Sequence, residues 1–269
     1  MTSSIEIHPE YEKLSLELDE MKDKLTKKIL EEHELYFHIC KNIEADYMIR
    51  LGYIEYNIFE REVEIKMLQR EIALIQKAIN QDAEVDTKAI KKKIAMEYDD
   101  YLFELDKKAS EFGALIRYSK NDQLSDDENE KLKNMYKKLI LKFHPDLNNN
   151  LTDEEKELFF KILHAYEAGD INILNLIFEL HYDNLSEDIV EDSIEALKER
   201  IKLLKIRIDV IQGSIDRIKL KYPYIKKDIL EDDDLLLKTK RELEDQLFEK
   251  NEIFDEYVDK LLELKGDYL

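Results

Sequence analysis

Apolar residues recur three and four positions apart along most of this chain, which is the spacing of one face of an α-helix. The longest regular run comprises Ile194, Leu197, Ile201, Leu204, Ile208, Ile211, Ile215 and Ile218. Only 5 glycines and 3 prolines interrupt the 269 residues, too few for a loop-rich or all-β architecture. The sequence therefore predicts an all-α protein built mainly from long amphipathic helices.

The first part of the chain, residues 1–118, predicts a bundle of three long helices folded on one another. The first helix begins near Tyr11 and is expected to end at a break around Gly52. The second carries isoleucines and a leucine at helical spacing up to Ile79, and Asp86 or the next residue is the expected N-cap of the third. This region is the first of three predicted domains.

The other two predicted domains are a compact central module, residues 119–182, and a C-terminal coiled-coil region, residues 183–269. In the C-terminal region two apolar stripes flank Pro223 and an acidic run, Asp232 to Asp234. Two comparable helices joined by a short connection favour an antiparallel hairpin. A homodimer through either stripe is the alternative, because apolar spacing does not say whether the partner helix lies in the same chain.

Composition excludes several classes of protein. No stretch approaches 18 consecutive apolar residues, so no membrane span is expected. A net charge of −21 argues against nonspecific nucleic-acid binding, which needs Lys and Arg to neutralise phosphates. The first residues lack the features of a secretory signal, so a cytoplasmic location is expected. Cys40 is the single cysteine, which excludes an intramolecular disulfide and fits a reducing compartment.

The central module opens with a helix whose charge contrasts with the rest of the chain. Ser125 and Glu128 have the spacing of a capping box, and Leu132, Tyr136, Leu139 and Phe143 follow at helical spacing. The lysines of this helix are Lys131, Lys133, Lys137, Lys138 and Lys142, and no acidic residue occurs from Lys131 to His144. A solvated charged face is the simplest interpretation of such a run.

The tripeptide His144-Pro145-Asp146 directly follows this helix. Pro145 disfavours the α conformation at His144, so the helix should end there and present His and Asp on an ordered, exposed loop. A second capping box, Thr152 with Glu155, begins the next helix, and Gly169 closes it. Two apolar-faced helices around a short loop should pack as an antiparallel pair with the tripeptide at its tip.

This arrangement resembles the J-domain of the DnaJ (Hsp40) family. The run from Tyr136 to Asp146 looks like the second helix and signature loop of that family, and the helix with Phe159, Ile162, Ala165 and Tyr166 is similar to its third. The Tyr-x-x-Leu-Gly pattern of the family's first helix is absent, so residues 109–118, around Phe112, Leu115 and Ile116, would have to supply it. The Gly/Phe-rich linker and the Cys-rich zinc region are also absent, which places the chain among J-proteins that share only this domain.

The resemblance implies a function. A protein of this family would bind an Hsp70-type chaperone and stimulate its ATP hydrolysis through the loop, with coiled-coil arms for a client or other partner. The implied contact residues are His144, Pro145, Asp146, Tyr136, Lys137, Lys138 and Lys142. The lysines would dock on an acidic surface of the chaperone, and Asp146 would meet a cation. ATP and Mg²⁺ belong to the chaperone, so no cofactor is expected here.

Competing interpretations carry less weight. His144 and Asp146 as a catalytic dyad lack a nearby nucleophile or Gly-rich anion-binding loop, so no enzyme activity is expected. His33 and His38 superficially resemble a zinc-protease helix, yet five positions separate them by about 140° around a helix, so no metal site is expected. The alternative function is a coiled-coil scaffold that contains a vestigial J-like module.

Overall fold

The computed structural model describes residues 9–120, 124–148, 150–181 and 193–268, and within these ranges it contains helices and no strand. The predicted all-α class is therefore confirmed. In chain order the elements are α1 (Pro9–Glu34), η1 (Leu35–Ile39), α2 (Cys40–Tyr47), η2 (Met48–Gly52), α3 (Tyr53–Asn80), α4 (Thr87–Glu97), α5 (Asp99–Lys120), α6 (Asp126–Phe143), α7 (Asp153–Glu167), α8 (Ile171–His181), α9 (Ile194–Lys219), η4 (Tyr224–Lys226), α10 (Lys227–Glu231) and α11 (Asp233–Tyr268). The elements η1 and η2 are π-helical turns, and η4 is a 3₁₀ turn.

These helices form two compact units, each of which joins segments far apart in the sequence. Unit 1 consists of residues Met1–Lys41 and Asp122–Ile225, and unit 2 consists of Asn42–Asn121 and Lys226–Leu269. This division differs from the predicted succession 1–118, 119–182 and 183–269. The reason is that each long N-terminal helix packs with a helix from the C-terminal part of the chain.

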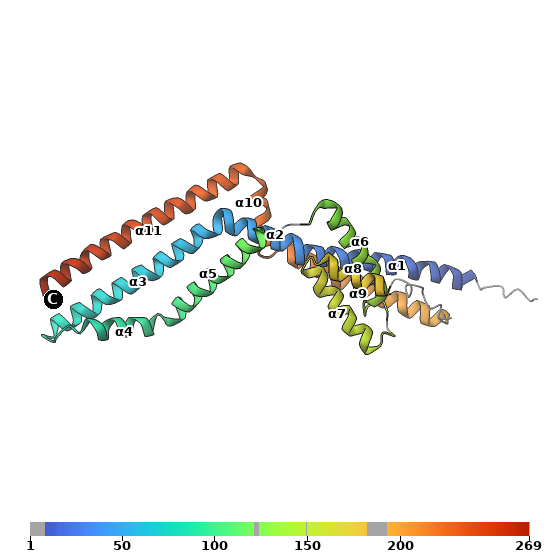
Figure 1. Cartoon of the computed structure of the whole chain (residues 1–269), viewed down its shortest axis with the longest axis horizontal. Coiled ribbons are helices and arrows are strands. Elements are labelled where there is room, and N and C mark those ends of the chain that lie inside the picture. Colours follow the sequence, from blue (N-terminus) through green and yellow to red (C-terminus); the bar gives the residue numbers. More distant parts are fainter. Residues whose placement is uncertain (1–8, 121–123, 149, 182–192, 269) are drawn as a thin grey trace, which may run out of the picture. The chain divides into compact units, whose positions relative to one another are not determined.

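In unit 1 the long helices α1 and α9 pair side by side (Figure 1). Lys198, Lys205 and Lys219 of α9 each form an ion pair with a glutamate of α1 that lies 188 positions earlier. A constant offset means that the two helices run parallel, and spacings of seven and fourteen residues are those of a heptad pattern. The buried apolar stripe of α9 is thus covered by α1. The predicted antiparallel hairpin of the two C-terminal helices is wrong.

The helices α6, α7 and α8 pack on one another and share one apolar core with the α1–α9 pair. Buried members of this core include Leu25 and Ile29 from α1, Leu139 and Ile140 from α6, and Leu204 from α9. The segment 109–118, expected to supply the first helix of a J-like module, lies in α5 and belongs to unit 2. The long helix that contacts α6 is α1 instead.

In unit 2 the helix α11 lies along α3, while α4 and α5 return along another side of α3 (Figure 1). Lys250 and Lys265 of α11 pair with Glu62 and Glu71 of α3, so these helices also run parallel. The predicted bundle of the first three helices is therefore wrong in one respect, because α1 packs in unit 1. Asp86 caps α4 as predicted, accepting hydrogen bonds from two backbone N–H groups.

Helical structure does not stop at Gly52, contrary to the prediction. Gly52 ends the π-helical turn η2 with φ −61°, an ordinary right-handed value, and α3 follows directly. A Cβ at this position would collide with the sulfur of Met48, so the glycine makes room for that side chain. Glycine here reflects packing rather than a chain reversal.

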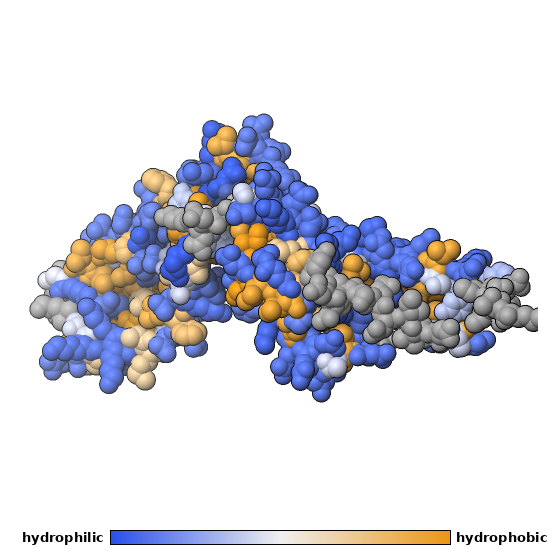
Figure 2. All heavy atoms as spheres, turned by 45° about the vertical axis from the view of Figure 1, so that its right-hand side comes forward, coloured by the Kyte–Doolittle hydropathy of each residue, from blue (hydrophilic) through white to orange (hydrophobic). Residues whose placement is uncertain are grey.

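The face seen in Figure 2 is mostly hydrophilic, with several apolar patches. Exposed apolar side chains include Met96 and Phe103 in unit 2 and Phe160 in unit 1. None of the helices in the described part of the chain combines the length and apolar character that crossing a bilayer requires.

Candidate functional site

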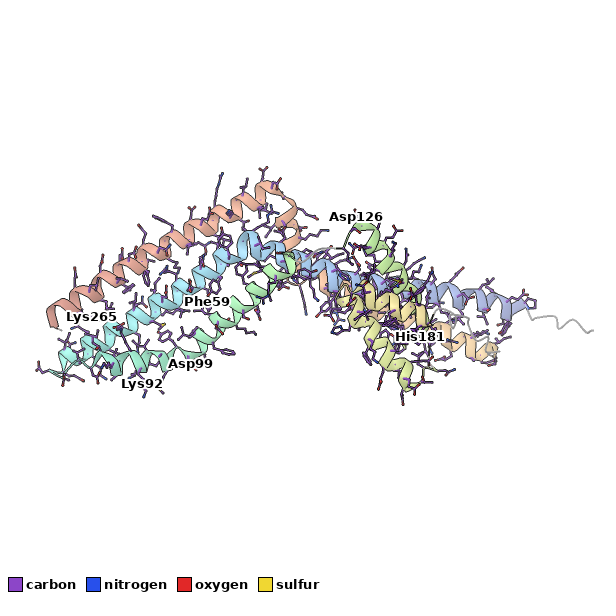
Figure 3. All side chains as sticks on the ribbon, in the orientation of Figure 1. Phe59, Lys92, Asp99, Asp126, His181 and Lys265 are labelled. Carbon is purple, nitrogen blue, oxygen red and sulfur yellow. The ribbon has the colours of Figure 1, made fainter. Side chains whose placement is uncertain are left out.

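The helix that leads to the tripeptide begins and ends as its sequence dictates. At its start, near Asp126 in Figure 3, Ser125 accepts a hydrogen bond from the Glu128 backbone N–H, and the Glu128 carboxylate accepts one from Ser125. At its end His144 takes the extended conformation, with φ −75° and ψ 127°. Both the predicted capping box and the predicted end of the helix before Pro145 are confirmed.

The loop after α6 is tightly closed on itself. The carbonyl of His144 accepts hydrogen bonds of 3.0 Å from the N–H groups of Leu147 and Asn148. The Asn148 amide donates to the carbonyl of Leu141, one of the last carbonyls of α6. Leu147 is buried in the unit 1 core with an exposed fraction of 3%. The tripeptide is therefore anchored on both sides, and Pro145 is its exposed member.

His144 is half-buried rather than fully exposed as predicted. Its ring packs edge-on against Phe159 of α7, with centroids 5.1 Å apart, and its Nδ1 accepts a hydrogen bond of 3.0 Å from the Asp146 N–H. Burial lowers the pKa of His144; Asp146 opposes this effect and Arg207 adds to it. The neutral ring with an acceptor at Nδ1 carries its proton on Nε2, which leaves one donor for another group.

Two arginines of α9 contact the loop. Arg207 forms an ion pair of 3.2 Å with the Asp146 carboxylate, and Arg200 donates a long hydrogen bond of 3.4 Å to the carbonyl of Leu147. The Asp146 side chain is 24% exposed and that of Arg207 is 55% exposed. The cation expected from a partner for Asp146 is thus supplied here by the chain itself.

Tyr136 cannot contact a partner from where it lies. Its side chain is fully buried, its ring stacks on Tyr166 of α7, and its hydroxyl is 2.7 Å from Nδ1 of His33 on α1. Its assignment to the partner-binding surface is wrong, because its position on the α6 stripe faces the core. The same burial raises the pKa of the Tyr136 hydroxyl, which stays protonated and shares a hydrogen bond with Nδ1 of His33.

The lysines of α6 fall into two stripes, because at about 100° per residue positions four apart lie on the same face of a helix whereas adjacent positions do not. Lys133 forms an ion pair of 2.9 Å with Glu34, and Lys137 lies near Asp23, so this stripe faces α1. Lys138 lies over the ring of Phe178 at 5.3 Å on the other flank, and Lys142 is on the same stripe. The predicted docking lysines therefore do not form a single surface.

Polar groups of α1 and η1 join this module at the stacked tyrosines. Tyr166 donates a hydrogen bond of 2.7 Å to Glu34, and the ring of His38 packs edge-on against that of Tyr166. Burial would raise the pKa of Glu34, but hydrogen bonds from Lys133 and Tyr166 outweigh it and the pKa is lowered. Burial lowers the pKa of His33 to about 4 and also lowers that of His38.

Neither alternative site is formed by the described residues: the catalytic dyad of His144 and Asp146, or a metal site that includes His33 and His38. The Asp146 carboxylate faces Arg207 rather than the His144 ring, so the pair lacks the geometry of a His–carboxylate dyad. Across the described part of the chain no three His, Cys, Asp or Glu side chains gather as metal ligands would. Cys40 is buried in the unit 1 core.

The residues that complete the loop's surroundings were not predicted from the sequence. Arg200 and Arg207 lie seven positions apart, on the edge of the apolar stripe of α9, a spacing that puts both on one face of the helix. That spacing was a readable signal, but nothing local connects it to residues 144–148. His33 and Glu34 likewise gain their role from packing against α6 and α7.

Comparison with known proteins adds no relative. No family model, no curated protein and no solved structure matches this chain.

Proposed function

We propose that this protein is a J-domain-type co-chaperone that binds an Hsp70-type chaperone and stimulates its ATP hydrolysis through His144, Pro145 and Asp146. One observation carries the proposal: the tripeptide lies on a closed loop between two capped, antiparallel helices, with Pro145 exposed and a lysine stripe on the preceding helix. A loop held by Leu147 and Asn148 presents a fixed shape, so little entropy is lost when a partner binds it.

The chemistry of the loop fits such a contact. The neutral His144 ring offers an Nε2 donor, and Asp146 offers a carboxylate that accepts from a cation. Lys138 and Lys142 add positive charge on the outward flank of α6, which would steer an acidic surface toward the loop.

The test is the steady-state ATPase rate of an Hsp70 from the same organism with wild-type protein and with His144→Gln. The variant should lose stimulation. Its matched control is His164→Gln, the same change at an exposed position of α7, which should stimulate as wild type. Because His144 packs on Phe159, unfolding is measured for both variants to separate lost contact from lost folding. Equal stimulation by wild type and His144→Gln refutes the proposal.

A helical scaffold is the second candidate function, and one observation favours it. The module shares its core with α1 and α9, and two of its proposed contact residues, Tyr136 and Asp146, are engaged within the chain. In that case the module would brace the long helices, and wild-type protein would stimulate no Hsp70.

A further inference from the structure

We propose that α9 masks the loop: Arg207 and Arg200 hold Asp146 and Leu147 in a closed state that a chaperone must displace. This inference rests on the proposed function and concerns the regulation of the same site. The carboxylate that a partner's cation would meet is already paired with Arg207 at 3.2 Å, and the two cations compete for one acceptor.

The helix that carries the arginines is fixed, whereas the arginine side chains are not. Leu204 lies between Arg200 and Arg207 in sequence and is buried in the core, as are Ile201 and Ile208. Separating α9 from the module would expose this core. Opening therefore requires only that the two arginine side chains change rotamer, and the side chain of Arg207, which is about half exposed, has solvent to enter.

The closed state is weak enough to be displaced. An ion pair with one partner more than half exposed to water shifts an equilibrium by about two- to fivefold, and the 3.4 Å hydrogen bond from Arg200 lies near the outer limit for such contacts. The apparent Kd of a partner equals its Kd for the open state divided by the fraction of molecules that are open. Masking should thus weaken chaperone binding by about two- to fivefold without abolishing it.

The test uses the full chain with Arg207→Gln, with Arg200→Gln and Arg207→Gln together, and with Arg217→Gln as the matched control. Arg217 is on the same helix and bonds the carbonyl of Gly213, one turn back. The first readout needs no chaperone: the titration midpoint of the His144 ring by NMR. Arg207 lowers the pKa of His144, so Arg207→Gln should raise that midpoint and Arg217→Gln should leave it unchanged.

The second readout is the concentration that gives half-maximal stimulation of the Hsp70 ATPase. Masking predicts a decrease of about two- to fivefold in both Arg207 variants, and none in the control. A His144 midpoint that does not move means that the contact is absent, which overturns the inference. A midpoint that moves without any gain in stimulation shows that the contact does not mask the loop, and the co-chaperone function stands. No stimulation by any protein, wild type included, refutes the proposed function and the masking with it.

Discussion

The rings of Tyr136 and Tyr166 lie face to face, with centroids 3.7 Å apart and planes 3° from parallel. Each hydroxyl reaches a polar group of α1: that of Tyr136 shares a hydrogen bond with Nδ1 of His33, and that of Tyr166 donates to Glu34. The stack thus joins α6 and α7 to each other, and its two hydroxyls join both to the long N-terminal helix.

Tyr136→Phe should lower the free energy of unfolding by about 1–3 kcal/mol, because it leaves Nδ1 of His33 without its buried hydrogen-bond partner while the ring remains. Tyr136→Ala should lower the free energy of unfolding more, by about 3–5 kcal/mol, since it also leaves a cavity in the core where the ring was. Urea denaturation followed by circular dichroism measures both. The control is Tyr36→Phe, which removes a hydroxyl from a side chain that is 57% exposed. A cost for Tyr136→Phe no larger than that of the control would contradict the hydrogen bond.

Acid should destabilise unit 1 before the carboxylates titrate. Burial lowers the pKa of His33, His38 and His144, so the folded state prefers them neutral while the unfolded chain protonates them near pH 6.5. The contribution of these neutral histidines to the free energy of unfolding is fully present above about pH 6.5, and it is lost as the pH drops toward the His33 pKa of about 4. His33 alone accounts for up to about 3 kcal/mol of this loss.

Urea unfolding at several pH values between 7.5 and 4.5 checks this dependence. His33→Gln should flatten the curve between pH 6.5 and 4.5, because it removes the group with the largest shift. His164→Gln, at an exposed histidine, should leave the curve as in wild type. Identical curves for wild type and His33→Gln would mean that His33 is not held neutral in the fold.

Local signals in the sequence predicted local structure well. The capping boxes at Ser125 and Thr152 are present, Gly169 has the positive φ of 66° that suits a helix end, and Asp86 caps the helix that follows it. Each of these devices is settled by residues within four positions of one another, so the chain elsewhere has little influence on them.

Pairing between distant helices was not predictable in the same way. The apolar stripe of α9 would look the same whether it packed on α1, on α11 or on a second copy of the chain, because apolar spacing does not specify the partner helix. Charged residues beside the stripes, such as Glu17 and Lys205, help to select the partner helix. A chain with 39% charged residues offers many alternative ion pairs, so the correct ones cannot be chosen from the sequence. The contact between Arg207 and Asp146 depends on that pairing, so it was hidden for the same reason.

The parallel register of α1 and α9 predicts which positions can be cross-linked. Cysteines replacing Glu17 and Lys205, whose side chains now form a 2.7 Å ion pair, should react together with a short bifunctional maleimide within one chain. Cysteines replacing Glu31 and Lys205 should not, because fourteen residues of α1 separate Glu31 from Glu17 by about 21 Å. Buried Cys40 should stay unmodified. Gel mobility after proteolysis distinguishes the products, and cross-linking of the second pair instead of the first would contradict the register.

The two lysine stripes of α6 should respond differently to the same substitution. Lys138→Glu reverses a charge on the outward stripe, so it should weaken stimulation of an Hsp70 by about three- to tenfold at low salt. The free energy of unfolding should stay within about 1 kcal/mol of wild type, which allows for the lost contact of Lys138 with the Phe178 ring. The effect on stimulation should shrink as salt rises, because exposed charges are screened within about 8 Å at physiological ionic strength.

Lys137→Glu, one position earlier, is the matched comparison. Lys137 lies near Asp23 of α1, and a glutamate there would face a like charge, so this variant should lower the free energy of unfolding by about 0.3–1 kcal/mol. It should change half-maximal stimulation less than Lys138→Glu does, because its side chain is directed toward α1 rather than toward a partner. ATPase titrations at two salt concentrations, with urea unfolding of both variants, measure the difference. Equal losses of stimulation at low salt would mean that both stripes reach the chaperone, and that α1 does not occupy the Lys137 flank when the complex forms.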